Sequence, residues 1–176
     1  MSDLLIMKAA NLFIGTADPE KSKHLQVVNL TLPTLEYVTA EHTPGGGSMG
    51  IEINMNVLKP LQPAFKLVGF DEEAYAAAGI GSNIPQIFTA RGVIQRLSDG
   101  KNFQSIATIK GVIGKITPEQ FERSKGMDHD HSIVEVTRYK LQIGEKVYFD
   151  VDFFAMKRIR FGIDELAEYR AFLGLV

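Results

Sequence analysis

Apolar and polar residues alternate along much of this chain, and the clearest case is the segment Ile51–Val57. Its apolar positions alternate with Glu52, Asn54 and Asn56. A period of two places the apolar side chains on one face of a β-strand and the polar ones on the other. This segment therefore predicts a strand that is buried on one side only.

Two tight turns predict two β-hairpins. The Asp99-Gly100 pair lies between β-rich runs, and glycine tolerates the positive φ that such turns need. The arms of this hairpin are predicted at about Gln86–Leu97 and Lys101–Ile116. A second hairpin is predicted at Ile133–Ile143 and Lys146–Met156, joined by Gly144 and Glu145.

Helical periodicity is sparse. The segment Asp71–Ala78 has an aspartate suited to the N-cap and Gly79 suited to the end of a helix. Ile163–Leu173 carries acidic residues in its first turns and an apolar stripe. Thr117–Lys125 has a capping-box pattern, although it is short enough to be a loop. The fold class predicted is mainly β, an antiparallel β-sandwich or barrel with one or two flanking helices.

Length and composition narrow the possible functions. The 176 residues suit a single domain over 1–176, in which 41–50 form a flexible glycine-rich loop. The chain has no cysteine, which excludes disulfides, thiolate metal sites and cysteine nucleophiles. The chain has a net charge of −2, whereas most proteins that bind duplex DNA carry an excess of basic residues. We expect neither a cleaved signal peptide nor a transmembrane helix.

The cluster Asp128–His131 is the strongest candidate for chemistry. Two imidazoles and two carboxylates within four residues could bind a divalent metal, with His129 and His131 as the candidate ligands. On a strand, however, the histidines would share one face and the aspartates would point the other way. The alternatives are a small-ligand or metal-binding β-barrel, hydrolytic in function, and a polar lead-in to the Ile133 strand.

Other motifs indicate structure rather than catalysis. The loop Gly45–Gly50 lacks the lysine and the following helix of a phosphate-binding loop. Glycines in Gly111–Gly114 suggest a bulge or a close backbone approach. The run Lys157–Arg160 is interpreted as a solvated link, and Asp150 and Asp152 as a solvated strand face. Because nucleophile, base and orienting partner do not occur together, we expect no enzyme activity and no cofactor.

Several segments, in order along almost the whole chain, resemble the major tail tube proteins of contractile-tailed bacteriophages and R-type bacteriocins. These are an Asn-Leu-Phe opening, a Leu-Thr-Leu-Pro segment, a glycine-rich loop, an Arg-Gly pair, a Tyr-Lys-Leu hairpin, a Gly-x-Asp-x-Leu segment with a following arginine, and a Gly-Leu ending. In the same order, these segments lie at Asn11–Gly15, Leu30–Tyr37, Gly45–Gly50, Arg91-Gly92, Tyr139–Gly144, Gly162–Ala167 with Arg170, and Leu173–Leu175.

The resemblance implies a structural virion protein with a β-sandwich fold. Such subunits form hexameric rings that stack into the inner tube of a contractile tail, through which DNA or other cargo passes without sequence-specific binding. The implied partners are further copies of the chain, the sheath protein, and baseplate and terminator proteins. The implied location is the virion tail, inside the sheath, after assembly in the bacterial cytoplasm, with no membrane anchor.

Within that hypothesis, contact and lumen residues can be proposed from flexibility and polarity. Flexible or apolar segments without an evident core role are expected to contact neighbouring subunits or rings, and the polar face of a long hairpin is expected to face the lumen. The expected contact residues are Pro44, Gly45, Gly46, Gly47, Ser48, Met49, Leu175 and Val176. The expected lumen residues are Asp150 and Asp152.

Overall fold

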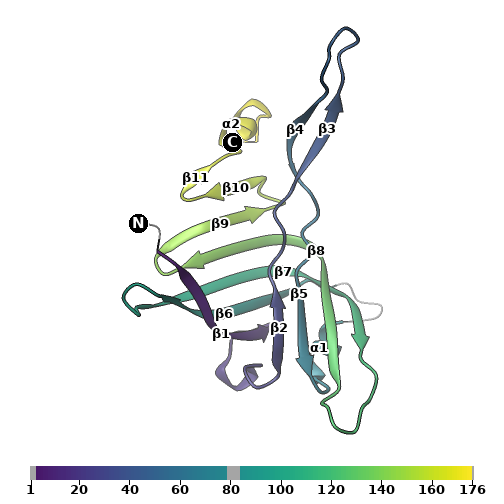
Figure 1. Ribbon diagram of the computed structural model, residues 1–176, viewed down its shortest axis with the longest axis vertical. Helices are drawn as coiled ribbons and strands as arrows, with labels where there is room; N and C mark the ends of the chain where they lie inside the picture. The colour runs from purple at the N-terminus through teal and green to yellow at the C-terminus, as the bar shows by residue number, and fades with distance from the viewer. Residues whose placement is uncertain (1–2, 79–83, 176) are drawn as a thin grey trace.

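The protein is mostly β in a computed structural model, which describes residues 3–78 and 84–175. A large antiparallel sheet has the strand order β1-β6-β7-β8-β9-β10-β11 (Figure 1). Its strands are β1 (Leu5–Ile14), β6 (Gln86–Arg96), β7 (Asn102–Pro118), β8 (Asp128–Ile143), β9 (Lys146–Asp152), β10 (Lys157–Arg160) and β11 (Ile163–Asp164). This confirms the predicted fold class.

Strand β8 connects this sheet to a second layer. Its C-terminal part pairs with β9, and its N-terminal part pairs with β5 (Ala64–Val68), which in turn pairs with β2 (Val27–Thr31). Strands β7 and β8 bend where their register shifts around Gly111 and Gly114. A Cβ on Gly111 would lie 2.8 Å from the backbone oxygen of Val134, so the predicted close approach is confirmed.

The core fills the space between the layers. Its buried side chains come from β1, β5, β6, β7, β8, β9, the first helix and the loop residue Leu61, and within the strands alternate residues point into it. The principal members are Leu12, Ile14, Phe65, Leu67, Phe88, Ile109, Ile113, Ile133, Tyr139 and Phe149.

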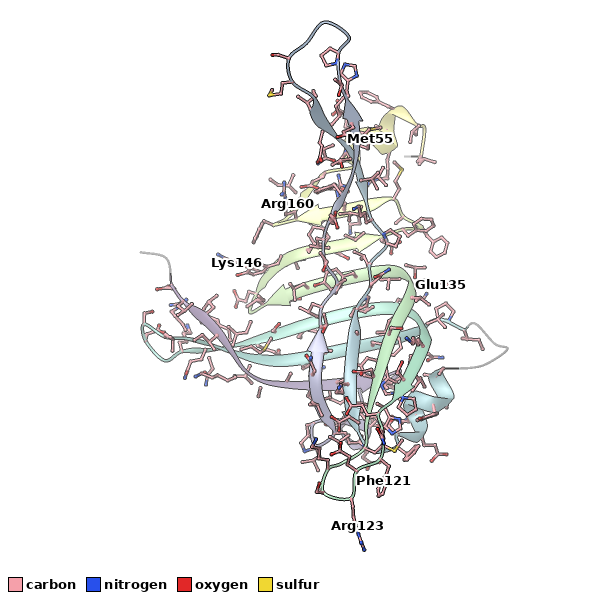
Figure 2. The ribbon with its side chains drawn as sticks, turned by 45° about the vertical axis from the view of Figure 1, so that its right-hand side comes forward. Met55, Phe121, Arg123, Glu135, Lys146 and Arg160 are labelled. Atoms are coloured by element: carbon pink, nitrogen blue, oxygen red, sulfur yellow. The ribbon has the colours of Figure 1, made fainter. Side chains whose placement is uncertain are left out.

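Strands β3 (Tyr37–His42) and β4 (Ile51–Leu58) form a separate two-stranded sheet. This hairpin, hereafter the arm, projects well beyond the rest of the molecule, and residues 43–50 form its tip (Figures 1 and 2). The strand predicted at Ile51–Val57 is confirmed. Its half-buried character is not, because the arm has no second layer to cover it.

Two of the predicted helices need correction. Helix α1 (Glu72–Ala77) matches the prediction, and the Asp71 side chain caps it by accepting a hydrogen bond from the amide of Ala74 at 2.9 Å. The predicted terminator Gly79 lies outside the described residues. Thr117–Lys125 is not helical, because Thr117 and Pro118 continue β7 in register with β8, and a turn follows.

The C-terminal helix is shorter than predicted. Ile163 and Asp164 form β11, paired with β10, and helix α2 spans only Ala167–Phe172. Asp164 accepts a hydrogen bond from the amide of Leu166, which fixes a turn before the helix. A 3-10 turn, η1, occupies Pro19–Lys21.

Both long hairpins are confirmed by the register of β6 with β7 and of β8 with β9. Strand β8 begins five residues earlier than predicted, at Asp128, and β9 ends at Asp152, where a turn follows. Among the described residues, no helix combines the length and apolarity needed to cross a membrane.

Candidate assembly surface

The arm exposes apolar side chains that a soluble monomer would normally bury. Ile51, Ile53, Met55 and Val57, hereafter the apolar arm residues, are between 44% (Ile53) and 56% (Val57) exposed (Figure 2 labels Met55). An isolated two-stranded hairpin is only marginally stable in water. An exposed apolar row on such a hairpin is typical of a surface that another protein covers.

The tip of the arm contains the predicted contact residues Pro44–Met49. The amide of Gly47 donates a hydrogen bond to the carbonyl of Pro44, which closes a turn. A Cβ on Gly45 or Gly46 would meet no atom within 4 Å, and Met49 is 72% exposed. The tip residues are therefore exposed and accessible to a neighbour.

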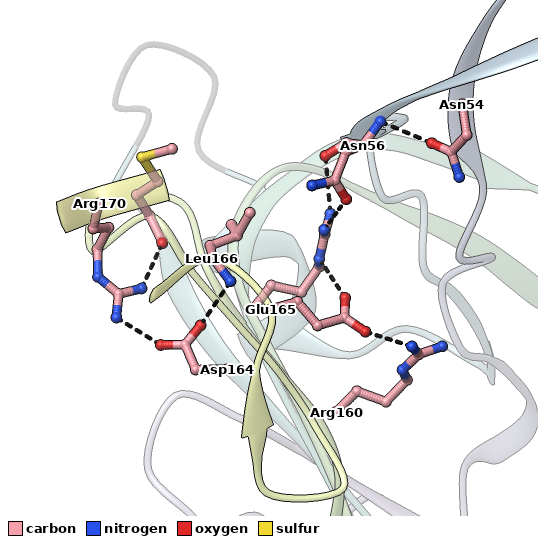
Figure 3. Close-up of polar contacts among 9 residues, drawn as sticks. Asn54, Asn56, Arg160, Asp164, Glu165, Leu166 and Arg170 are labelled. Carbon is pink, nitrogen blue, oxygen red and sulfur yellow. Dashed lines mark hydrogen bonds and ion pairs between the residues drawn. The ribbon is translucent and has the colours of Figure 1, made fainter. Parts of the chain in front are cut away.

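Arg158 fixes the base of the arm to the C-terminal segment by joining Asn56 and Glu165, which Figure 3 labels. Its guanidinium donates to the carboxylate of Glu165 at 2.7 Å, to the backbone oxygen of Asn56 at 3.1 Å and to the Asn56 side chain. The same group lies over the ring of Tyr37, at 5.2 Å from its centroid. Arg158 is only 3% exposed, so the interpretation of Lys157–Arg160 as a solvated link is wrong for this residue.

A second ion pair secures helix α2. The Arg170 guanidinium lies 2.7 Å from the Asp164 carboxylate and donates to the carbonyl of Met156 at 3.0 Å (Figure 3). This arginine holds the pKa of Asp164 below its usual range, although burial opposes the shift. Apolar side chains nevertheless remain exposed around the helix, namely Phe161, Ile163, Phe172, Leu173 and Leu175.

Sequence reasoning placed Leu175 and Val176 among the contact residues. Leu175 is 59% exposed and is therefore accessible to a neighbour. Val176 lies outside the described residues. Sequence reasoning missed the apolar arm residues as a contact surface, because alternation alone shows that a face is apolar but not what covers it.

The histidines of Asp128–His131 are core residues. His129 and His131 point inward from β8, and the ring of His131 stacks on Phe65 with centroids 4.6 Å apart. His129 Nδ1 lies 2.9 Å from the Tyr75 hydroxyl. Burial lowers the pKa of His131 from its ordinary value.

The two aspartates of this segment point away from the histidines, as the strand geometry predicted, and Asp130 lies 3.5 Å from the ammonium group of Lys66. Within residues 3–78 and 84–175, no group of three or more histidine or carboxylate side chains is arranged to hold a metal ion. The polar lead-in interpretation is also wrong, because this segment belongs to β8. The structure therefore offers no support for the metal-dependent alternative.

Asp150 and Asp152 point away from the core on β9. Asp150 is 8% exposed, and its carboxylate lies 3.8 Å from Arg138 and 3.9 Å from Lys157, so it is not on a freely solvated face. Asp152 is more accessible and accepts a hydrogen bond from the amide of Ala155 at 3.0 Å.

Comparison with solved structures shows the same fold in contractile injection machinery. One match is a chain of the sheath-tube complex of the PVC extracellular contractile injection system in its extended state. It has a TM-score of 0.52 and 8% identity, over 76% of this chain and 88% of that chain. Another is a chain of the sheath/tube terminator of that system, with a TM-score of 0.53 and 10% identity, over 76% of this chain and 93% of that chain. No curated protein matches.

The family comparison covers nearly the whole chain. The model of the phage tail tube protein FII family matches residues 6–174, which include the large sheet, the arm and helix α2. This range also contains every segment that carried the resemblance, apart from the final residue of the Gly-Leu ending. The chain therefore belongs to the phage tail tube protein FII family and has a structural role in a tail tube.

Proposed function

We propose that this chain assembles into hexameric rings that stack into the tube of a contractile tail or injection system. The observation that carries the proposal is the arm, whose apolar residues are exposed and have no covering layer in their own subunit. Full burial of an exposed side chain of this kind contributes about 1.5–3 kcal/mol, and because each of these is about half exposed, covering it at an interface contributes roughly half of that. Several buried together, in each of six subunits, would stabilise a ring stack.

The two kinds of contact use different parts of the subunit. The tip residues Pro44–Met49 and the apolar arm residues contact the adjacent ring. Strand β1 pairs with β6 on one side, and Leu5 and Met7 on it are 40% and 48% exposed. A neighbour in the same ring covers this edge, since ring closure removes open sheet edges. Leu175 and Val176 contribute to contacts between subunits.

The tube serves as a passive conduit inside a sheath, and the contracting sheath supplies the energy. Asp150 and Asp152 face the lumen, through which DNA or other cargo passes. The sheath, the baseplate and the tail terminator are the partners, and assembly takes place in the bacterial cytoplasm. The similarity to chains of a sheath-tube complex and of a sheath/tube terminator supports these partners. No step of this role requires catalysis.

The experiment compares tube formation by the whole chain and by two arm variants. One variant lacks Pro44–Ser48, and the other carries Ile53→Lys and Met55→Lys, which place charges on the surface to be buried. Pelleting by ultracentrifugation measures assembly, and far-UV circular dichroism measures folding. We expect both variants to fold and to remain in the supernatant.

The matched control carries two lysines on other exposed apolar positions, Leu25→Lys and Phe121→Lys, which are 85% and 71% exposed. This control should pellet like the unchanged chain. Normal tubes formed by either arm variant would refute the contact role of the arm.

A further inference from the structure

A groove opens at one end of the core, where the core-facing side chains of the large sheet become small. The cross-strand pairs of β6 and β7 on this face decrease in size toward that end. They are, in order, Phe88 with Ile109, Ala90 with Ala107, and Gly92 with Ser105. Residues of β2 line the same groove together with the small pairs, and the space has a volume of about 400 Å³.

The groove is apolar and large enough to receive side chains from outside. Its lining includes Ala10 of β1, Leu30 of β2, and Leu32, besides the two alanines of the sheet. An apolar cavity of about 150 Å³ holds one benzene-sized group, so this groove has room for roughly two or three aliphatic side chains. Side chains placed there would add van der Waals contacts that its lining lacks in the single subunit.

Strand β2 has an unpaired edge at this groove. Within the described residues it pairs with β5 alone, and β1, which also lines the groove, pairs with β6 alone. Val28 and Asn29 of β2 are exposed and line the groove, and Val28 is 54% exposed. An open edge of this kind accepts an added strand, whose main chain pairs with the edge and whose alternate side chains fill the neighbouring space.

The arm has the features that such an added strand needs. Strand β4 pairs with β3 along one edge, and no other described strand pairs with it. The apolar arm residues alternate along β4, and Ala40 of β3 lies opposite Ile53 on their face. The other face of the arm is polar and carries Glu41 directly opposite Glu52. The arm therefore presents one apolar face and one free strand edge.

We propose that the groove between β1 and β2, hereafter the arm groove, receives the arm of a second copy of this chain. Strand β4 of one copy adds to the free edge of β2 in the other, and its apolar arm residues cover the small residues of β6 and β7. This inference rests on the proposed function, in which the arm contacts the adjacent ring, and it assigns the surface that receives the arm. The arm of the same subunit extends away from β1 and β2 (Figure 1).

The occupant is a second copy because each chain supplies one arm and one arm groove. The two surfaces are different parts of the same chain, so the contact between them is head-to-tail. Head-to-tail contacts that do not close into a ring repeat without limit in one direction. Arm-to-groove contacts between rings therefore produce a stack of rings with a single polarity, in which every subunit donates one arm and accepts another.

Cross-linking tests the contact directly, because the chain has no cysteine of its own. The test protein carries Met55→Cys on the arm and Val28→Cys in the arm groove. The control carries Met55→Cys and Phe121→Cys, the latter at an exposed position at the opposite end of the molecule (Figure 2). The purified full chains are treated with a short bismaleimide cross-linker under assembly conditions and are separated on a denaturing gel.

We expect a ladder of dimers, trimers and longer species from the test protein, since each chain has one donor and one acceptor position. The control and the two single-cysteine variants should give no species longer than a dimer. A ladder of equal yield in the control would overturn the proposal. Cross-links confined to single chains would also overturn it, since they would show that the arm folds back onto its own groove.

A second measurement blocks the arm groove without changing the arm. Val28→Lys/Asn29→Lys places two charges on the free edge of β2, and Gln120→Lys/Phe121→Lys is the matched control on an exposed loop. The groove variant should raise the concentration needed for half of the chain to pellet by at least about tenfold, equivalent to about 1.4 kcal/mol. Far-UV circular dichroism should stay unchanged in both, and equal pelleting of the two variants would overturn the proposal.

Electron microscopy of the cross-linked samples separates this inference from the proposed function. Tubes without a cross-link between positions 55 and 28 would refute the arm groove alone. A ladder formed by particles that lack six-fold rings would refute the proposed function alone. Absence of both tubes and ladder would overturn both.

Discussion

Arg158→Met is the substitution that most directly tests how the arm is held. It keeps much of the side-chain volume and removes the ion pair with Glu165, the hydrogen bonds to Asn56 and the contact with the ring of Tyr37. The Arg158 and Glu165 side chains are 4% and 17% exposed. Removing one partner of a buried pair typically costs about 3–5 kcal/mol.

The cost here falls at the lower end of that range. Arg160 also lies 2.7 Å from Glu165 and would still compensate its charge, so we expect a loss of about 3 kcal/mol in the free energy of unfolding. For a chain of this size, that corresponds to a fall of roughly 6–12 °C in Tm. The matched control is Arg160→Met, whose side chain is 60% exposed and whose loss should cost less than about 1 kcal/mol.

The assay combines urea denaturation of unassembled subunits with amide hydrogen exchange. In Arg158→Met, exchange should accelerate in β3 and β4 while the core strands β6 and β7 stay protected, because the arm loses its anchor and the core does not. Equal destabilisation by Arg158→Met and Arg160→Met, or unchanged exchange in the arm, would refute the reasoning.

Three further predictions concern the subunit core. Lys23→Met removes the ammonium group that lies 2.7 Å from the buried Asp71 carboxylate, and it should lower the free energy of unfolding in urea by about 3 kcal/mol. The control Lys125→Met, whose side chain is 73% exposed, should lower it by less than about 0.5 kcal/mol. Because burial lowers the pKa of His131 in the folded state, unfolding takes up a proton below pH 6.5. The unfolding free energy should therefore fall as pH drops below 6.5, by at most about 1.4 kcal/mol per pH unit for this group, and His131→Phe should flatten that slope. Gly111→Ala should cost about 1–3 kcal/mol and lower Tm, since its Cβ would meet the backbone of β8; an unchanged Tm would contradict the close approach.

Local patterns in the sequence predicted the elements that depend on local physics. The Asp99-Gly100 turn and the alternation along the hairpins indicated β6 to β9, and the N-cap Asp71 marked the start of α1. The helix predicted from the capping pattern at Thr117 does not form, because pairing with β8 stabilises an extended strand there. A tertiary partner outweighs a weak local helix signal.

The candidate site depended on contacts between distant segments, which a single sequence does not reveal. Arg158 contacts Asn56, which lies 102 positions earlier in the sequence. Because the sequence does not reveal this contact, the basic run Lys157–Arg160 was interpreted as a solvated segment. His129 and His131 looked like metal ligands or a polar turn, yet stacking on Phe65 and hydrogen bonding to Tyr75 make them core side chains. The one signal available for the arm was its unusual apolar alternation next to a glycine-rich loop.

The proposed function requires self-assembly into a hollow tube of six-subunit rings. Electron microscopy of the purified chain, over a series of concentrations and with preformed tail baseplates added as nuclei, tests it most directly. We expect stacked rings or hollow tubes whose end views have six-fold symmetry. Particles that remain single subunits at every concentration and with nuclei present, or rings of another symmetry, would contradict it.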